Sequence, residues 1–144
     1  IVNHTNFREA SRHSKLLVAK SSQYDRFLIE SGKLRLLYGF EELYSKDSLH
    51  QRASGLNHTL CHLAYENDVA IGIPYGSLIA SNTSHLLIGR LIQNIRLCRK
   101  FKQKTIIASF TGLPYRLRAA QDVKSLFRLL GMEDGVISKS LTEI

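Results

Sequence analysis

The sequence predicts an α/β fold in which parallel strands alternate with helices, arranged like part of a TIM barrel. Four short apolar runs are spaced along the 144 residues, and each precedes a segment with helical periodicity. This alternation indicates parallel strands, because parallel neighbours need a long crossover connection. A complete eightfold barrel needs about 250 residues. We therefore expect one domain, residues 1–144, holding an incomplete barrel of about four strand-helix units that other residues or another chain would complete.

The predicted strands are apolar along their whole length, as expected for strands buried on both faces. They cover residues 15–19 (KLLVA), 34–38 (LRLLY), 69–73 (VAIGI) and 105–109 (TIIAS).

The predicted helices follow the strands, and their ends carry recognisable signals. Ser22 and Asp25 have the spacing of a capping box, and Gly32 and Gly131 stand where helices commonly end. Apolar residues recur at helical spacing through the longer segments. The expected helices cover residues 22–30, 54–67, 84–102, 119–130 and 133–142.

Composition limits the environment of the protein. Apolar residues make up 44% of the chain, as in a globular protein, and no apolar run approaches the ~20 residues that cross a bilayer. Cys61 and Cys98 lie far apart among apolar neighbours, which favours buried free thiols over a disulfide or a metal pair. We expect a reducing compartment, the cytoplasm, and no membrane partner.

The positive charge is concentrated in one part of the chain. The formal charge is +8, and no acidic residue lies between Asp68 and Asp122. That window holds eight cations, whereas the rest of the chain has twelve cations and twelve acids. A surface of one sign attracts polyanions, so the pattern favours nucleic acid over a merely solvated basic face. The eight cations are Arg90, Arg96, Arg99, Lys100, Lys102, Lys104, Arg116 and Arg118.

Two segments within this window are candidates for RNA contact. The sequence NIRLCRKFKQK (residues 94–104) places several cations on one helix face, where phosphates would relieve their repulsion. The loop FTGLPYRLRAAQD (residues 110–122) follows a predicted strand, where α/β proteins build their sites. Within it, Arg118 and Asp122 predict either a surface ion pair worth about 0.3–0.5 kcal/mol or an arginine held toward a phosphate. Tyr75 and Tyr115, expected in loops, are candidates for stacking on unpaired bases.

A zinc site is an alternative use of the histidines in this chain. His58 and His62 are four residues apart, so a helix would present both on one face, with Glu66 one turn further. The zincin pattern needs a glutamate directly after the first histidine, and Thr59 stands there instead. The predicted strand ends also lack the histidines and aspartates of metal-dependent barrels, so we expect no metal site.

The motifs, taken together and in order, resemble one known family. RASGLNHTLCHLAYENDVAIGI (residues 52–73), NIRLCRKFKQKTIIASFTG (residues 94–112), PYRLRAAQD and LFRLLGM are similar to segments of the ribonuclease P protein component three family. The resemblance covers residue 34 to the C-terminus. Two departures are visible: the family has further strands ahead of this region, and often Ser-Pro where this chain has Ala119 and Ala120.

The resemblance implies a barrel-like fold and a subunit of the ribonucleoprotein that removes the 5′ leader of precursor tRNA. It implies that catalysis comes from the ribonuclease P RNA with magnesium, that this chain needs no cofactor, and that protein component two is its close partner. Precursor tRNA is then an indirect partner. The family's RNA-related positions fall here on Arg52, His58, Lys100, Arg118 and Asp122.

We therefore expect a non-catalytic RNA-binding subunit. Its RNA-binding residues would be Arg52, His58, Arg90, Arg96, Arg99, Lys100, Arg116, Arg118 and Asp122. Around SGLNH we expect Ser54 and Gly55 to open a helix, and Asn57 and His58 to face RNA or a partner. Two alternatives stay open: a metal-dependent barrel hydrolase or nuclease, and a protein-interaction module with an incidental basic face.

Overall fold

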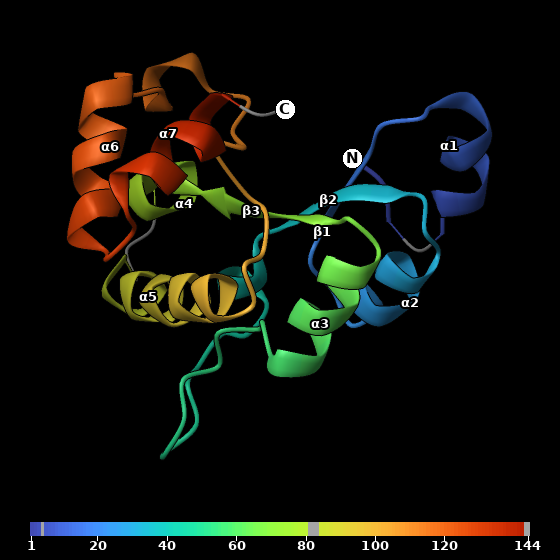
Figure 1. The fold of residues 1–144 in the computed structure, drawn as a ribbon, viewed down its shortest axis with the longest axis horizontal. Coiled ribbons are helices and arrows are strands. Elements are labelled where there is room, and N and C mark those ends of the chain that lie inside the picture. Colours follow the sequence, from blue (N-terminus) through green and yellow to red (C-terminus); the bar gives the residue numbers. More distant parts are fainter. Residues whose placement is uncertain (4, 81–83, 143–144) are drawn as a thin grey trace.

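Four parallel strands form one sheet, with the order β1-β2-β3-β4 (Figure 1). The computed structural model describes residues 1–3, 5–80 and 84–142. Each strand pairs with the one before it in the chain, and the prediction of all four is confirmed to within two residues at each end. The strands are β1 (Leu17–Lys20), β2 (Leu34–Tyr38), β3 (Ala70–Pro74) and β4 (Thr105–Ala108).

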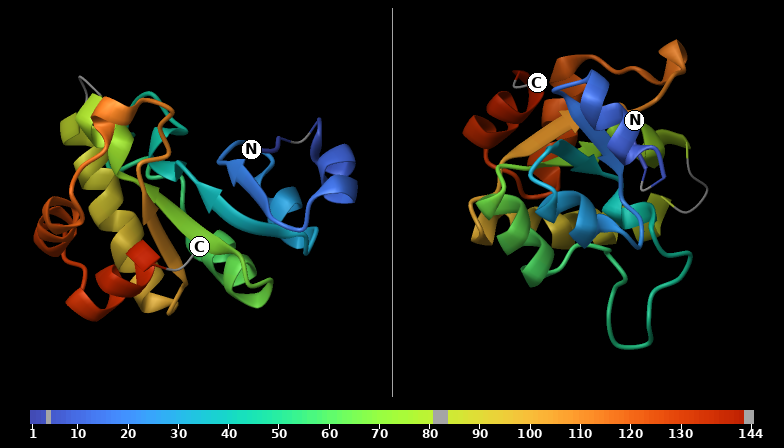
Figure 2. Two further views of the ribbon diagram at one scale, coloured as in Figure 1. Left: turned by 90° about the horizontal axis from the view of Figure 1, so that it is seen from above. Right: turned by 90° about the vertical axis from the view of Figure 1, so that its right-hand side faces the viewer.

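Helices connect the consecutive strands and also precede the first strand and follow the last one, and all five predicted helices are present (Figure 2). Two further helices, α1 (Phe7–His13) and α4 (Tyr75–Ala80), were not predicted. The others are α2 (Asp25–Glu30), α3 (His58–Glu66), α5 (Ser84–Lys100), α6 (Ala120–Leu129) and α7 (Asp134–Thr142). Two short 3₁₀ turns, η1 (Phe40–Glu42) and η2 (Pro114–Arg116), follow β2 and β4.

The capping box predicted for Ser22 and Asp25 forms only in part, because α2 begins at Asp25 and its N-cap is Tyr24, which makes no side-chain cap bond. The Ser22 backbone N–H donates to Oδ1 of Asp25 at 2.7 Å, and the Ser21 hydroxyl donates to Oδ2 at 2.5 Å. Asp25 is buried, and burial raises the pKa of its carboxyl. These bonds satisfy donors ahead of the helix that would otherwise be buried without acceptors.

The core lies between the sheet and the helices, and it has two main clusters. One joins β1 and β2 to α2 and α3 around Leu37, and the other joins Ile73 and Ile107 to α5, α6 and α7. Because side chains alternate along a strand, Leu36 and Ile106 belong to the opposite face, where a smaller cluster forms. All five residues of β3 are buried, as a central parallel strand requires.

Both cysteines are buried free thiols, which confirms the prediction from their spacing. Cys61 on α3 and Cys98 on α5 belong to the same apolar cluster. Burial raises the pKa of the Cys61 thiol to about 11, and burial also moves the pKa of Cys98 far above its ordinary value. Within the described ranges, no helix is long and apolar enough to cross a membrane.

A loop of residues 43–57 projects from the body of the molecule between η1 and α3 (Figures 1 and 2). The Ala53 backbone N–H donates to Oδ1 of Asp47 at 2.9 Å and closes the base of this loop. Leu49, at its tip, is 93% exposed. The loop therefore has a fixed base and an exposed end.

Candidate nucleic-acid interface

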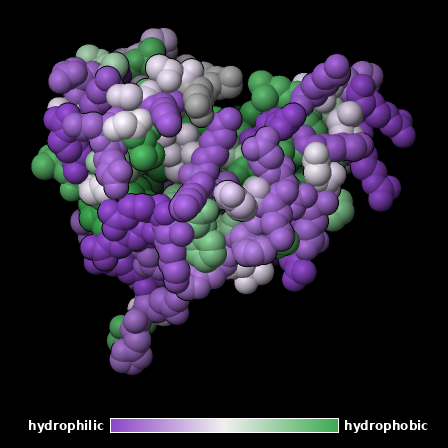
Figure 3. All heavy atoms as spheres, in the orientation of Figure 1, coloured by the Kyte–Doolittle hydropathy of each residue, from purple (hydrophilic) through white to green (hydrophobic). Residues whose placement is uncertain are grey.

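The last turns of α5 and the turn that follows expose a cluster of cations. Five basic side chains lie within nine residues, all exposed: Arg96, Arg99, Lys100, Lys102 and Lys104. Arg96, Arg99 and Lys100 have no ion-pair partner in the described part of the chain. Figure 3 shows hydrophilic side chains over much of α5 on one face. A helix end with this much uncompensated charge is suited to a polyanion.

His58 and Lys100 are brought together at one aromatic ring. The His58 ring lies 5.5 Å from the Phe101 ring, centroid to centroid, and Lys100 Nζ lies 5.8 Å from the same centroid. Phe101 is half-buried against the core. The first residue of α3 and the last residue of α5 therefore share one surface, although 42 positions separate them in the sequence.

The SGLNH segment positions His58 by local backbone chemistry. Gly55 has φ +77°, and a Cβ at this position would collide with the Phe40 carbonyl, so glycine is required there. Asn57 is the N-cap of α3, and its side chain accepts from the Leu60 N–H at 2.9 Å. The helix thus begins at His58 rather than near Ser54, which is buried, and the Asn57 side-chain oxygen is used for the cap.

Arg52 contacts α5 from the base of the projecting loop. Its Nη1 donates to the Gly89 carbonyl at 3.1 Å. A Cβ on residue 89 would lie 2.8 Å from this nitrogen, so glycine leaves room for the guanidinium. Arg52 itself is exposed, and it therefore adds positive charge beside the first half of α5.

Arg90 is not a surface residue, which corrects the expectation that it contacts RNA. Its side chain is 2% exposed, and Nε donates to Oδ1 of Asp47 at 2.7 Å. Nη1 donates to the carbonyls of Glu41 and Tyr44, at 2.8 and 2.6 Å. A guanidinium enclosed by protein oxygens is unavailable to a phosphate, so Arg90 anchors the projecting loop to α5.

Glu41 is buried close to this arginine. Burial raises the pKa of the Glu41 carboxyl to about 8, and the neighbouring charge of Glu42 acts in the same direction. Lys20 and Arg90 act the opposite way but do not outweigh the burial. The pKa of Asp47 is lowered, first by the Ala53 N–H and then by Arg90. At the base of the loop, Asp47 is therefore ionised and Glu41 stays protonated near neutral pH.

In the segment after β4, Arg116 is the last residue of the 3₁₀ turn η2 and Arg118 lies just beyond it. Arg118 Nη1 donates to the carbonyls of Tyr115 and Leu117, at 3.0 and 2.9 Å. In the described residues it forms no ion pair with Asp122, so the expected Arg118–Asp122 pair is absent. The backbone of η2, not the carboxylate, orients this guanidinium.

The two tyrosines proposed for stacking differ in how far they are exposed. Tyr75 is buried at the start of α4 and belongs to the core, so it is not available to a base. Tyr115 is 72% exposed, and the Arg116 guanidinium carbon lies 5.8 Å from its ring centroid. Only Tyr115, of these two, lies on the surface beside a cation.

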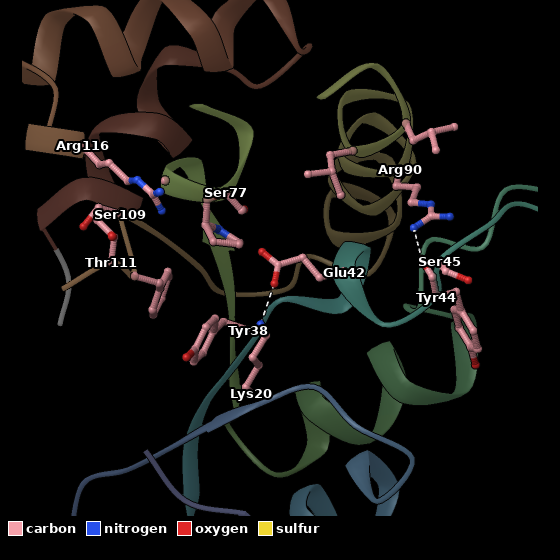
Figure 4. A pocket seen from close by; sticks show the side chains of 15 residues that line it. Lys20, Tyr38, Glu42, Tyr44, Ser45, Ser77, Arg90, Ser109, Thr111 and Arg116 are labelled. Carbon is pink, nitrogen blue, oxygen red and sulfur yellow. Dashed lines mark hydrogen bonds and ion pairs between the residues drawn. The ribbon is translucent and has the colours of Figure 1, made fainter. Parts of the chain in front are cut away.

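The carboxyl ends of the strands surround a hollow of about 490 Å³ (Figure 4). Lys20 and Arg116 enter it from different elements, and Tyr38 packs against Phe110 in its wall, with ring centroids 4.1 Å apart. Lys20 Nζ lies 2.6 Å from Glu42 Oε2, and this bond raises the pKa of Lys20. The paired lysine leaves Arg116 as the more available cation in this hollow.

The side chains of His58 and His62 contact different partners. His62 Nδ1 lies 3.3 Å from Glu66 Oε2, while His58 packs on Phe101. Over the described residues, no group of three or more histidines, cysteines, aspartates and glutamates is placed to hold a metal ion.

Sequence reasoning missed Phe101 and Gln103, which connect α5 to its neighbours. Phe101 follows Leu97 at helical spacing, and both pack against the core, so its apolar periodicity was the available signal. The Gln103 side-chain amide donates from Nε2 to the Val69 carbonyl at 2.5 Å. Nothing in its sequence neighbourhood distinguishes it from a solvated glutamine.

A family model described as RNase P subunit p30 matches residues 42–144. Ribonuclease P protein component 3 of Methanosarcina acetivorans is 30% identical over 95 residues, which cover 65% of this chain and 40% of that protein. The corresponding Methanococcus maripaludis (strain C5) protein is 24% identical over 129 residues, covering 85% and 55%. The chain thus spans about half the length of these curated relatives.

One solved structure has the same fold. A chain in the cryo-EM structure of archaeal ribonuclease P with mature tRNA superposes with a TM-score of 0.76 at 16% identity. The superposition covers 97% of this chain and 60% of that one. The predicted TIM-barrel-like arrangement of parallel strands and helices is confirmed.

Proposed function

The chain belongs to the RNase P subunit p30 family, and from this we propose that it serves as an RNA-binding protein subunit of ribonuclease P. The observation that carries the RNA-binding role is the meeting of His58 and Lys100 at Phe101, next to the exposed Arg96 and Arg99 of α5. The guanidinium groups of Arg96 and Arg99 match phosphate geometry, and Lys100 adds a point charge.

In the proposed particle this chain positions RNA and does not perform the chemistry. The ribonuclease P RNA supplies catalysis with magnesium, and the chain itself needs no cofactor. Its partners are that RNA, protein component two, and precursor tRNA indirectly. Two buried free thiols are compatible with a reducing cytoplasm.

The first test is cleavage of precursor tRNA by a cognate ribonuclease P RNA at modest magnesium. The reactions contain RNA alone, RNA with this chain, RNA with component two, and RNA with both proteins. The proposal expects faster cleavage with both proteins than with either, and none without RNA. Cleavage by the protein alone that a chelator abolishes would instead support a metal-dependent nuclease.

The second test assigns the contact surface. Lys100→Ala and Arg118→Ala should each weaken binding of ribonuclease P RNA and lower the slope of log affinity against log salt by about one phosphate contact. Arg8→Ala, an equal loss of charge on exposed α1, is the matched control. Equal slopes for all three variants and the wild type would remove Lys100 and Arg118 from the RNA surface.

A further inference from the structure

A second hollow lies between the end of α5, the start of β4 and α7. The turn of residues 101–104 separates it from α3. Its volume is about 340 Å³. Ile95, Cys98 and Met132 are buried residues that line it, and Val136 stands at its edge with 42% of its surface exposed. The hollow therefore has an apolar floor that water solvates poorly.

Basic residues surround this apolar floor. Arg99, Lys102 and Lys139 are exposed and line the hollow, whereas Glu133 is the acid that lines it. Lys104 also borders it and makes contacts of its own. Arg99 belongs both to this rim and to the cationic surface at the end of α5, so the hollow is continuous with the proposed RNA surface.

Gln103 supplies a polar group at the wall. The residue is 8% exposed, and its Nε2 is bonded to the Val69 carbonyl. Its Oε1 is buried and accepts no hydrogen bond from the described residues. Because this oxygen is fully buried, a group in the hollow does not reach it, and Gln103 fixes the wall through its bond to Val69. The amide also borders a smaller groove beside Tyr65 and Asp68, so the test must separate the two.

We propose that this hollow binds a single unpaired RNA base, such as adenine. This inference rests on the proposed function. The base lies on the apolar floor beside the Arg99 guanidinium, and the flanking phosphates contact Lys102 and Lys139. Unpaired bases are bound in this way, by stacking on a planar or apolar surface beside cations that contact the backbone phosphates.

The rim favours RNA over a protein partner. Four basic residues and one acid border the hollow, and this excess repels most basic RNA-binding proteins while attracting a phosphate backbone. An acidic protein segment is the competing occupant, and it is an outcome of the test below.

The test compares two short oligouridylates, one with a central adenosine and one with a central abasic residue, by fluorescence anisotropy at fixed salt. Both carry the same phosphate charge. The wild-type chain should bind the adenosine oligomer about fivefold or more tightly, the lower end of the effect of one bound base. Val136→Trp fills the edge of this hollow without changing charge, and it should abolish the difference. Leu129→Trp, on α6 and 85% exposed, should preserve it.

The outcomes separate this inference from the proposed function. If neither oligomer nor ribonuclease P RNA binds, both fail. If both oligomers bind the wild type equally, the RNA surface stands and the base pocket is overturned. If Val136→Trp leaves the preference intact, this hollow is not the site. If it weakens binding of purified component two instead, the hollow is a protein contact and the inference is wrong. Thermal unfolding of both tryptophan variants confirms that they fold.

Discussion

The arginines in the two halves of α5 have different roles. In the first half, Arg90 is buried and donates to Asp47 and to two backbone carbonyls. In the second half, Arg96, Arg99 and Lys100 are exposed and have no ion-pair partner among the described residues. One helix thus uses a cation to hold the fold at one end and presents cations to a partner at the other.

The difference shows why a count of charges along the sequence overstates a binding surface. The acid that pairs with Arg90 lies 43 positions earlier, outside the window that lacks acids. Arg90 is buried and paired, so it does not belong to the binding surface that the count of cations in that window suggests. Burial and the position of the acid in space, not charge density in the sequence, separate the two roles.

The largest expected effect comes from removing Arg90. Arg90→Ala leaves Asp47 and two carbonyls without their donor, so the free energy of unfolding should fall by about 3 kcal/mol or more, measured by urea denaturation. Arg96→Ala is the matched control in the other half of the helix. Unchanged stability combined with weaker RNA binding would erase the contrast between the two halves.

The buried Glu41 next to Arg90 predicts a pH dependence of stability. The pKa of Glu41 keeps the folded state protonated up to about pH 8, whereas the unfolded chain loses this proton near pH 4.5, the ordinary pKa of a glutamate. Between these values the folded state binds more protons, so stability falls as pH rises. We expect a loss of about 3 kcal/mol between roughly pH 5 and pH 8.

The Glu41 prediction has a direct control. Glu41→Gln cannot ionise and should flatten the decline when urea unfolding is repeated across this range. Glu133→Gln, an exposed acid, should leave the slope as in the wild type. A wild-type stability that rises over the same range would contradict the protonated state.

A smaller effect is expected where Arg52 meets α5. In Gly89→Ala the new methyl displaces the Arg52 guanidinium, which is exposed and flexible, and the bond to the Gly89 carbonyl is lost. The gain of about 1 kcal/mol in helix propensity offsets this loss. Urea denaturation should therefore show a net change under about 1 kcal/mol, and RNA affinity should change as it does in Arg52→Ala. A difference between these two variants would show that Arg52 binds without help from this contact.

The smallest effect on stability is expected in the second half of the helix. Arg96→Ala removes an exposed charge, so the free energy of unfolding should change by less than about 0.5 kcal/mol. The same variant should lower the salt slope of RNA binding, as a lost phosphate contact does. A clear destabilisation without any change in RNA binding would place Arg96 with Arg90 as a residue of the fold.

The sheet was predictable because its strands are short apolar runs bounded by polar or turn residues. The helices that escaped prediction are short: α4 begins at Tyr75 immediately after β3, with no intervening loop. The Pro-Tyr-Gly-Ser sequence there resembles a turn, and burial of Tyr75 against the second core cluster overrides that local signal. α1 has seven residues and buries only Phe7, so its periodicity is weak.

The candidate site was predictable in its residue types and less so in its geometry. The motifs identified His58 and Lys100 but not Phe101 between them, because contacts across 42 positions are not visible in local patterns. Arg118 was expected to pair with Asp122, yet backbone carbonyls hold it. A helix brings residues four apart onto one face, but α6 begins at Ala120, so Arg118 lies outside it.

The burial of both thiols allows the separation of α3 from α5 to be measured by the reaction of the cysteines. Cys61 and Cys98 sit on α3 and α5 in one apolar cluster, and their raised pKa values keep them as unreactive thiols. A thiol reagent can therefore modify them only when these two helices separate. The modification rate, followed by mass, would time that separation without any introduced label, and it would show whether bound RNA slows it.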